Sequence, residues 1–324
     1  MSRSAFNLGT VPSTPALAGV VLLCLALLAA CAAPQASRLR TQDFAELPPR
    51  HLIADVPFVG QTPYHCGPAA LSMVAQHAEV PVDANAMQAK VFVPALKGAL
   101  QAEMLAAPRR FGLMSIEIEP SLRALLRHVA AGTPVIVLQN LSLPVQPLWH
   151  YAVVIGYDLP ANEIVLHSGN DPQMRLSIDA FEHTWARSKH WAMIAARPDR
   201  VPESVGEAAY VRAAAALERV DLRAAHRAYV RGTLRWPDSR YLQFGLANTY
   251  AAQQQQAQSR EVLERLVRSF PDWGDAWNNL AVIRAELGDR AGALDAIERA
   301  VQLGGPHAAL YLETRERLAK TPAR

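Results

Sequence analysis

The stretch QTPYHCGPAALSMV (residues 61–74) places Cys66 directly before a Gly-Pro pair and a run typical of a helix. Pro68 suits the first turn of a helix, where its missing N–H carries no penalty, so Cys66 is predicted to lie at the helix N-terminus. The dipole and the free N–H groups at that end favour an anion, and a thiolate is the nucleophile of cysteine chemistry. We therefore expect the pKa of Cys66 to lie below the ordinary thiol value of about 8.5.

Attack by a thiolate also needs an imidazole that transfers protons and donors that stabilise an oxyanion. The side-chain amide of Gln61, upstream of Cys66, and the backbone N–H of Cys66 are candidate donors. Among the ten histidines, His150 opens an apolar strand pattern, HYAVVIGY, directly after a proline-rich loop. A histidine at the exposed end of a strand can meet a helix N-terminus across a cleft, so His150 is the candidate base.

Two stretches, VPFVGQTPYHCGPAALSMV and HYAVVIGYD, together resemble the signature sequences of bacteriocin-processing, double-glycine-type cysteine peptidases. These enzymes are a branch of the papain-like fold, and the resemblance covers roughly residues 53–196. It implies that Cys66 is the nucleophile, that His150 is the general base and acid, and that Gln61 belongs to the oxyanion hole.

The residue that orients the imidazole is left open. Enzymes of this family usually carry an Asp, often followed by Pro, on the strand after the histidine. Here that strand ends LHSGNDPQ, and a tight hairpin at DLPAN brings residues near 168–170 opposite His150, with Asp171 just beyond. Asn170 and Asp171 are therefore the candidates, and a plain turn at this point is the alternative.

The other two cysteines, Cys24 and Cys31, lie in an N-terminal segment with a basic residue near its start and an apolar stretch from 16 to 30. This layout is typical of a secretory signal and is short for a membrane span. The residues LAAC resemble the lipobox of bacterial lipoproteins, which implies cleavage before Cys31 and acylation of its thiol. An ordinary signal peptide is the alternative. Ala32 after the acylated cysteine resembles the outer-membrane case, so we expect an anchor in the outer membrane that faces the periplasm.

Cys66 is then the only free thiol of the mature chain. A lone cysteine in an exported protein is a buried apolar residue, a partner for another chain or a reactive group. The formal net charge of +3 argues against a nucleic-acid partner, which would need a strongly basic face. No metal or other cofactor is implied, because no spaced set of further ligands accompanies Cys66.

Changes in composition divide the chain into four parts, of which the third and fourth are domains of ordinary size. They are the signal segment (1–30), a polar tether (31–50), an α+β domain (51–198) and a helical part (206–320). Within the α+β domain, helical patterns precede strand patterns. The helices are expected at 68–77, 84–91, 96–108 and 120–130, and the strands at 134–141, 150–158, 163–169 and 190–196. The proline-flanked junction at 197–204 is expected to let residues 51–198 fold alone.

The helical part repeats with a period of 34 residues. Ala213, Ala247 and Ala281 are spaced by this period, as are Pro237 and Pro271. Small residues recurring where two helices cross are the physical signature of a tetratricopeptide repeat. We expect three units and a capping helix, and we expect this array of helices to dock a protein partner. The units are placed at 206–239, 240–273 and 274–307.

Two functions of different classes fit these features. The first is a membrane-anchored cysteine peptidase that cleaves an exported peptide or protein, with the repeats docking the substrate or a partner. The second is a non-catalytic scaffold that binds a peptide. An acyl transfer of the transglutaminase or amidase type would use the same residues as the peptidase.

Overall fold

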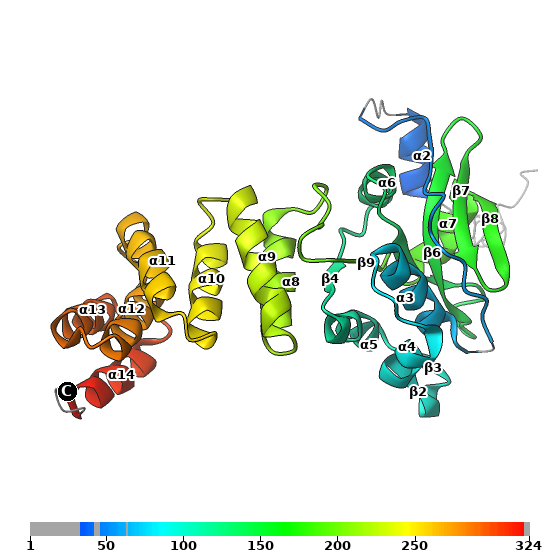
Figure 1. Cartoon of the computed structure of the whole chain (residues 1–324). Helices are drawn as coiled ribbons and strands as arrows, with labels where there is room; N and C mark the ends of the chain where they lie inside the picture. The colour runs from blue at the N-terminus through cyan, green and yellow to red at the C-terminus, as the bar shows by residue number, and fades with distance from the viewer. Residues whose placement is uncertain (1–32, 42–45, 63, 321–324) are drawn as a thin grey trace, which may run out of the picture.

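The computed structural model describes residues 33–41, 46–62 and 64–320. It consists of a sheet-containing N-terminal domain and an array of helices that extends away from one side of that domain (Figure 1). The predicted signal segment and Cys31 lie outside the described residues. None of the described helices is long and apolar enough to cross a membrane.

The N-terminal domain is built on a seven-stranded antiparallel sheet. Its strands follow the order β4-β9-β5-β6-β7-β8, and β1 pairs with β6. The strands are β1 (Arg50–Leu52), β4 (Met114–Glu117), β5 (Val135–Asn140), β6 (Trp149–Asp158), β7 (Glu163–Ser168), β8 (Asp171–Ser177) and β9 (Ala192–Ala196). A separate ribbon joins β2 (Phe92–Val93) to β3 (Gly98–Ala99).

Helix α3 (Cys66–His77) lies at the centre of this domain and packs against β5, β6 and β9. Every residue from 67 to 75 is buried. A helix that is apolar on nearly all sides is stable only when it is surrounded by protein, and α3 is enclosed by the sheet, by α4 (Ala84–Val91) and by β3. The first residue of α3, Cys66, is consequently fixed to the core.

Three of the four expected helices are present, namely those at 68–77, 84–91 and 120–130, and the last of them is α6 (Leu122–Ala130). All four expected strands are also present. The prediction of one continuous helix over residues 96–108 is wrong. Lys97 adopts φ 48°, which ends the short 3₁₀ helix η1 (Pro94–Leu96), and the chain continues through β3, α5 (Gln101–Ala106) and the 3₁₀ helix η2 (Pro108–Phe111). Strands β4 and β8 and helix α7 (Ile178–Ala186) were not predicted.

The predicted tether of residues 31–50 is not a free linker in its first half. Residues Pro34–Thr41 form helix α2, which packs against α7, and Ala36 is buried. The backbone N–H groups of Gln35 and Ala36 donate hydrogen bonds to the fully buried carboxylate of Glu182 in α7. A carboxylate at a helix N-terminus satisfies free N–H groups and interacts favourably with the dipole, so a residue distant in sequence stabilises this helix.

The helical part consists of three helix pairs and a final helix. The helices are α8 (Glu207–Glu218), α9 (Leu222–Arg235), α10 (Arg240–Ala252), α11 (Gln256–Ser269), α12 (Gly274–Glu286), α13 (Arg290–Leu303) and α14 (Ala308–Lys320). Small residues let these helices approach closely. A Cβ on Gly245 would lie 2.2 Å from the ring of Tyr229, so only glycine fits where α10 crosses α9.

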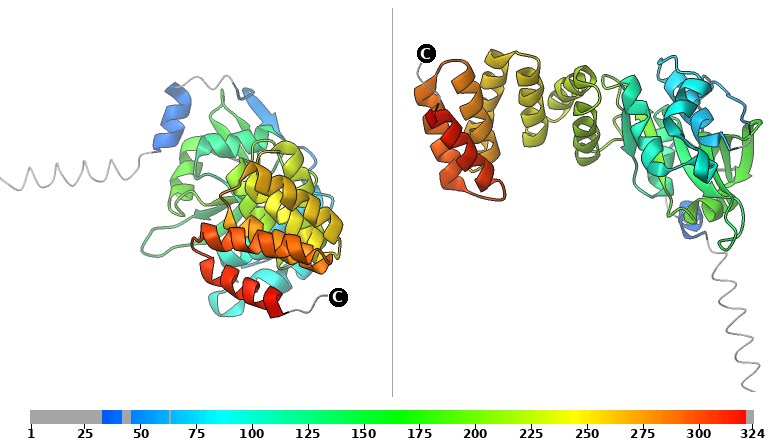
Figure 2. Two further views of the ribbon diagram at one scale, coloured as in Figure 1. Left: turned by 90° about the vertical axis from the view of Figure 1, so that its left-hand side faces the viewer. Right: turned by 90° about the horizontal axis from the view of Figure 1, so that it is seen from below.

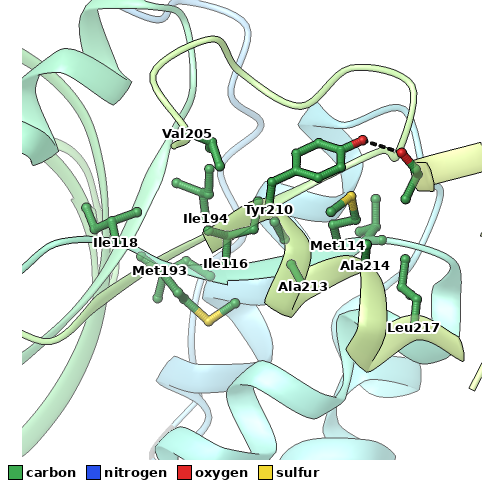
Figure 3. Close-up of a cluster of buried hydrophobic side chains, with 14 of the residues drawn as sticks. Met114, Ile116, Ile118, Met193, Ile194, Val205, Tyr210, Ala213, Ala214 and Leu217 are labelled. Carbon is green, nitrogen blue, oxygen red and sulfur yellow. Dashed lines mark hydrogen bonds between the residues drawn. The ribbon is translucent and has the colours of Figure 1, made fainter. Parts of the chain in front are cut away.

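The two parts share a hydrophobic interface (Figure 3). Helix α8 packs against β4, the edge strand of the sheet. The interface contains Met114, Ile116 and Ile118 from the segment of β4, Met193 and Ile194 from β9, and Val205, Tyr210, Ala213, Ala214 and Leu217 from the repeat side. The junction at 197–204 therefore does not separate two independent cores, because β4 presents apolar side chains that α8 covers.

A buried histidine also lies at this junction. His128 of α6 is 5% exposed, and its Nδ1 lies 2.7 Å from the Oγ of Ser204. Burial lowers the pKa of His128 from 6.5 to about 4. The folded chain therefore keeps this imidazole neutral over a range in which an unfolded chain protonates it.

We predict that acid destabilises the junction through His128. The unfolded chain takes up a proton near pH 6.5 and the folded chain only near pH 4, so stability present above pH 6.5 is lost as the pH falls toward 4. The loss at pH 4 should reach about 3 kcal/mol. Urea unfolding at pH 7, 5.5 and 4 measures it. His128→Asn should flatten the pH dependence; an equally steep dependence in His128→Asn would contradict the assignment.

Candidate active site

Cys66 begins α3 after a tight turn. His65 is the N-cap residue and makes no side-chain capping hydrogen bond, and its N–H donates to the carbonyl of Thr62. Tyr64 adopts φ 69°, a left-handed conformation that is uncommon for an aromatic residue. Strained backbone of this kind persists only where the surrounding structure holds it, and such positions are concentrated at functional sites.

Gly67 brings the start of α3 into close contact with its neighbours. A Cβ at this position would lie 2.9 Å from the Cβ of Ala99 and 3.0 Å from the sulfur of Met104. Glycine therefore allows Cys66 to reach the beginning of β6, where its sulfur accepts a hydrogen bond from the backbone N–H of Tyr151. Tyr151 directly follows His150, so the structure brings the thiol to the strand end that carries the imidazole.

The thiol of Cys66 is half-buried, and this burial raises its pKa above the ordinary value. Hydrogen bonds from the N–H groups of Tyr151, Gly67 and Cys66 itself act in the opposite direction and are weaker. The expectation of a lowered pKa is therefore wrong. The helix N-terminus does stabilise the thiolate, but the loss of solvent around a buried sulfur outweighs it.

The imidazole of His150 is held by a hydroxyl group. Its Nε2 lies 2.9 Å from the Oγ of Ser168, which is 8% exposed at the end of β7. Burial lowers the pKa of His150 below its ordinary value of 6.5. Because neither a carboxylate nor a thiolate compensates, the resting pair of Cys66 and His150 is neutral.

Gln61 contributes two different groups to the site. Its backbone N–H donates to the Oδ1 of Asn170 at 2.8 Å, which fixes the segment before Cys66 against the turn between β7 and β8. Its side-chain Nε2 is buried and has no hydrogen-bond partner among the described residues. A buried donor left unsatisfied destabilises a protein by about 1–3 kcal/mol, so this amide is a group that needs a functional explanation.

The two residues predicted to orient the imidazole, Asn170 and Asp171, have other surroundings than His150. Asn170 binds the backbone of Gln61, and Asp171 begins β8 with an exposed side chain. Neither of them makes a described hydrogen bond to His150, whose partner is Ser168. Cys66 is thus brought to Tyr151, the residue after His150, while Asn170 contacts the backbone of Gln61.

Two residues that hold the site were not among the sequence-based candidates, although the expected hairpin placed Ser168 near His150. Ser168 contacts His150, and His167, which is 3% exposed, lies with its Nε2 3.1 Å from the carbonyl of Val56. His167 thereby fixes the strand-like segment that leads to Gln61. His167 and Ser168 form a polar pair at the end of β7, directly after the apolar residues IVL. Two adjacent polar residues at the end of a buried strand are the sequence signal that could have identified them.

The chemistry available here is acyl transfer through a sulfur nucleophile. A thiol, an imidazole and an amide donor are the three components that thioester formation requires, and Cys66, His150 and Gln61 carry these groups. Within residues 33–41, 46–62 and 64–320, no three His, Cys, Asp or Glu side chains group so that they could hold a metal ion.

Family models match both parts of the chain. Residues 53–193 match the Peptidase C39 like family, and residues 210–272 and 244–308 match the tetratricopeptide repeat. The chain therefore has a C39-like peptidase domain followed by tetratricopeptide repeats, and the predicted fold class is confirmed. No curated protein matches the chain.

Several solved structures are similar to one part or the other. A putative C39-like peptidase from Bacillus anthracis is 16% identical, covers 48% of this chain and 99% of its own, and has a TM-score of 0.39. A double glycine motif protease from an AMS/PCAT transporter, in complex with the leader peptide, is 20% identical, covers 44% and 91%, and has a TM-score of 0.35. The Sgt2 TPR domain from Aspergillus fumigatus is 23% identical, covers 39% and 90%, and has a TM-score of 0.32.

The neutral resting pair predicts how Cys66 reacts with iodoacetamide. Because burial raises the thiol pKa, the alkylation rate should increase mainly above the ordinary thiol pKa of about 8.5. The chain of residues 33–324 contains Cys66 as its only cysteine, so mass spectrometry reports this site alone. His150→Ala should leave the profile nearly unchanged. Appreciable alkylation below neutral pH that His150→Ala abolishes would instead indicate a resting thiolate–imidazolium pair.

Proposed function

We propose that this protein is a cysteine peptidase that hydrolyses a peptide bond in an exported peptide or protein. The observation that carries the proposal is the buried Nε2 of Gln61, which has no hydrogen-bond partner among the described residues and lies five residues before a cysteine at a helix N-terminus. We assign this free amide donor to the oxyanion hole. The match of residues 53–193 to the Peptidase C39 like family supports the same chemistry.

In the first half-reaction, His150 is the general base. With its Nε2–H donated to Ser168, the lone pair of Nδ1 takes the thiol proton of Cys66 as the sulfur attacks the carbonyl carbon of the substrate. The side-chain amide of Gln61 and the N–H of Cys66 donate to the developing oxyanion. The tetrahedral intermediate then collapses, the imidazolium gives its proton to the leaving amine, and a thioester remains on Cys66.

In the second half-reaction, water replaces the amine. His150 takes a proton from the water as its oxygen attacks the thioester carbon, and the same donors hold the second oxyanion. Collapse breaks the carbon–sulfur bond, the proton returns from the imidazolium to sulfur, and the carboxylic product leaves. The imidazole is charged only during each transfer, which is consistent with a site that lowers its resting pKa.

Ser168 is the proposed orienting residue. A hydroxyl that accepts Nε2–H fixes the tautomer and the ring plane, as the third residue does in other triads. It stabilises an imidazolium less than a carboxylate does, because it carries no charge. Asn170 is assigned a positioning role through the backbone of Gln61, and Asp171 retains none in this proposal.

A non-catalytic, peptide-binding scaffold is the alternative function. The raised pKa of Cys66 and the lack of a carboxylate on His150 favour it, since both lower the reactivity of the site. We further propose that acylated Cys31 anchors the protein to the outer membrane on the periplasmic side, and that the repeats dock the substrate or a partner. The lipobox-like residues LAAC and the family match of residues 210–308 support these two points.

Substrate profiling with a peptide library tests the peptidase assignment on residues 33–324. We expect cleavage that Cys66→Ser abolishes and that His150→Ala lowers by about 100-fold or more. Ser168→Ala should lower kcat roughly fivefold, the value of one lost hydrogen bond. Ser168→Asp should shift the acidic limb of the rate profile to higher pH, because a carboxylate raises the pKa of the imidazole.

The outcomes of this profiling distinguish a peptidase from a scaffold, and Ser168 from Asp171 as the orienting residue. Peptide binding without turnover in the wild type would favour the scaffold. A larger loss in Asp171→Asn than in Ser168→Ala would transfer the orienting role to Asp171. Asn170→Ala should act through Gln61, so it should lower the rate without the change in pH profile that Ser168→Asp causes.

A separate experiment tests the anchor. Cys31→Ser removes the thiol that acylation requires, so the protein should leave the membrane fraction or keep its signal segment. Membrane fractionation and intact mass measure both effects in bacterial cells, with Cys24→Ser as the matched control. A Cys31→Ser protein with unchanged mass and unchanged location would contradict the lipoprotein proposal.

A further inference from the structure

An exposed apolar loop precedes His150. The β5–β6 loop (residues 141–148) and the first residue of β6 present their largest apolar side chains to solvent. Val145 is 90% exposed, Leu143 63%, Leu148 59%, Trp149 49% and Leu141 46%. The loop contains no Asp, Glu, Lys, Arg or His residue. A projection of large apolar side chains without charged residues among them marks a surface that another apolar phase covers.

The loop is held firmly at its base. The Oδ1 of Asn140 accepts hydrogen bonds from the N–H groups of Ser142 and Leu148, at 3.0 and 2.9 Å. The N–H of Leu141 donates to the carbonyl of Leu148 at 2.9 Å. Arg187, at the end of α7, donates to the carbonyls of Asn140 and Ser142. The apolar side chains therefore project from an ordered hairpin.

The same helix α7 also holds the point where the chain enters the domain. Glu182 binds the first N–H groups of α2, and Arg187, which binds the loop, lies about 7–8 Å further along the helix axis. Figure 2 shows α2, in blue, and the green loop that leads into β6 on the same side of the molecule. Cys31 is two residues before Ala33, so covalent geometry keeps it within about 7 Å of that residue.

From this arrangement we propose that the β5–β6 loop inserts into the surface of a lipid bilayer. Leu143, Val145 and Leu148 enter the acyl region, and Trp149 lies at the level of the headgroups, where its amphipathic ring is favoured. An acyl anchor at Cys31 would bring that bilayer to the side of the domain that carries the loop. The contact adds a second attachment to the proposed anchor.

The insertion does not depend on the proposed peptidase activity. It is tested with residues 33–324, which lack the site of acylation but keep every described residue of α2. Sedimentation with vesicles of phosphatidylethanolamine and phosphatidylglycerol measures binding. Quenching of tryptophan fluorescence by brominated lipids measures how deeply Trp149 enters the bilayer. Cys66→Ser should bind these vesicles as the wild type does, so a failed peptidase proposal leaves this result interpretable.

We expect Leu143→Glu and Val145→Glu each to weaken vesicle binding by about tenfold or more, because an exposed apolar group is replaced by a charge. Leu234→Glu is the matched control, since Leu234 is 70% exposed on α9 and should not affect binding. Unchanged thermal unfolding would show that the variants fold.

Four results would overturn the proposal. The wild type could fail to bind vesicles, or both loop variants could bind as tightly as the wild type. Alternatively, Val145→Glu could spare vesicle binding and abolish cleavage of a soluble peptide, which would assign the loop to substrate. A concentration-dependent dimer that Val145→Glu dissociates, without vesicle binding by the wild type, would assign it to a second copy of the chain.

Discussion

The burial of residues 67–75 of α3 is the constraint on which the site depends. A helix without a solvent-facing side must be matched by neighbours on every face, so the sheet, α4, α5 and the β2–β3 ribbon are all built around it. The absence of a side chain at Gly67 lets the ribbon and Met104 close over its first turn. Cys66 then has no freedom to move away from β6, and the position of the thiol relative to His150 follows from core packing rather than from contacts between the two residues.

The same burial explains why the thiol of Cys66 and the imidazole of His150 are uncharged at rest. A sulfur and an imidazole that are both removed from water favour their neutral forms, and Ser168 adds a dipole but no charge. Activation then depends on donors that interact with the transition state more strongly than with the resting enzyme. In the proposed mechanism the unsatisfied amide of Gln61 is such a donor, and the backbone N–H of Gln61 is held by Asn170.

Sequence patterns were sufficient where the signal is local. Cys66 before Gly-Pro predicted a helix start, the apolar run after His150 predicted a strand, and the period of 34 residues predicted the repeats. The partner of His150 could not be obtained in this way, because the pairing of β6 with β7 shifts register between Val154 and Gly156. A shift of one residue moves a side chain to the other face of a sheet, so only the folded hairpin determines that Ser168 and not Asn170 meets the imidazole. The thiol pKa depends on burial, and α2 depends on Glu182, which is 146 residues from Ala36.

The buried carboxylate of Glu182 also determines how far the site could reach from an anchorage at residue 31. If Cys31 is the proposed anchor, docked α2 would hold the domain close to the bilayer. If α2 were released, residues 33–50 could extend over about 60 Å, and the site would range through a much deeper volume. On that proposal, the contact between Glu182 and α2 would set the distance from the bilayer at which a substrate meets the site.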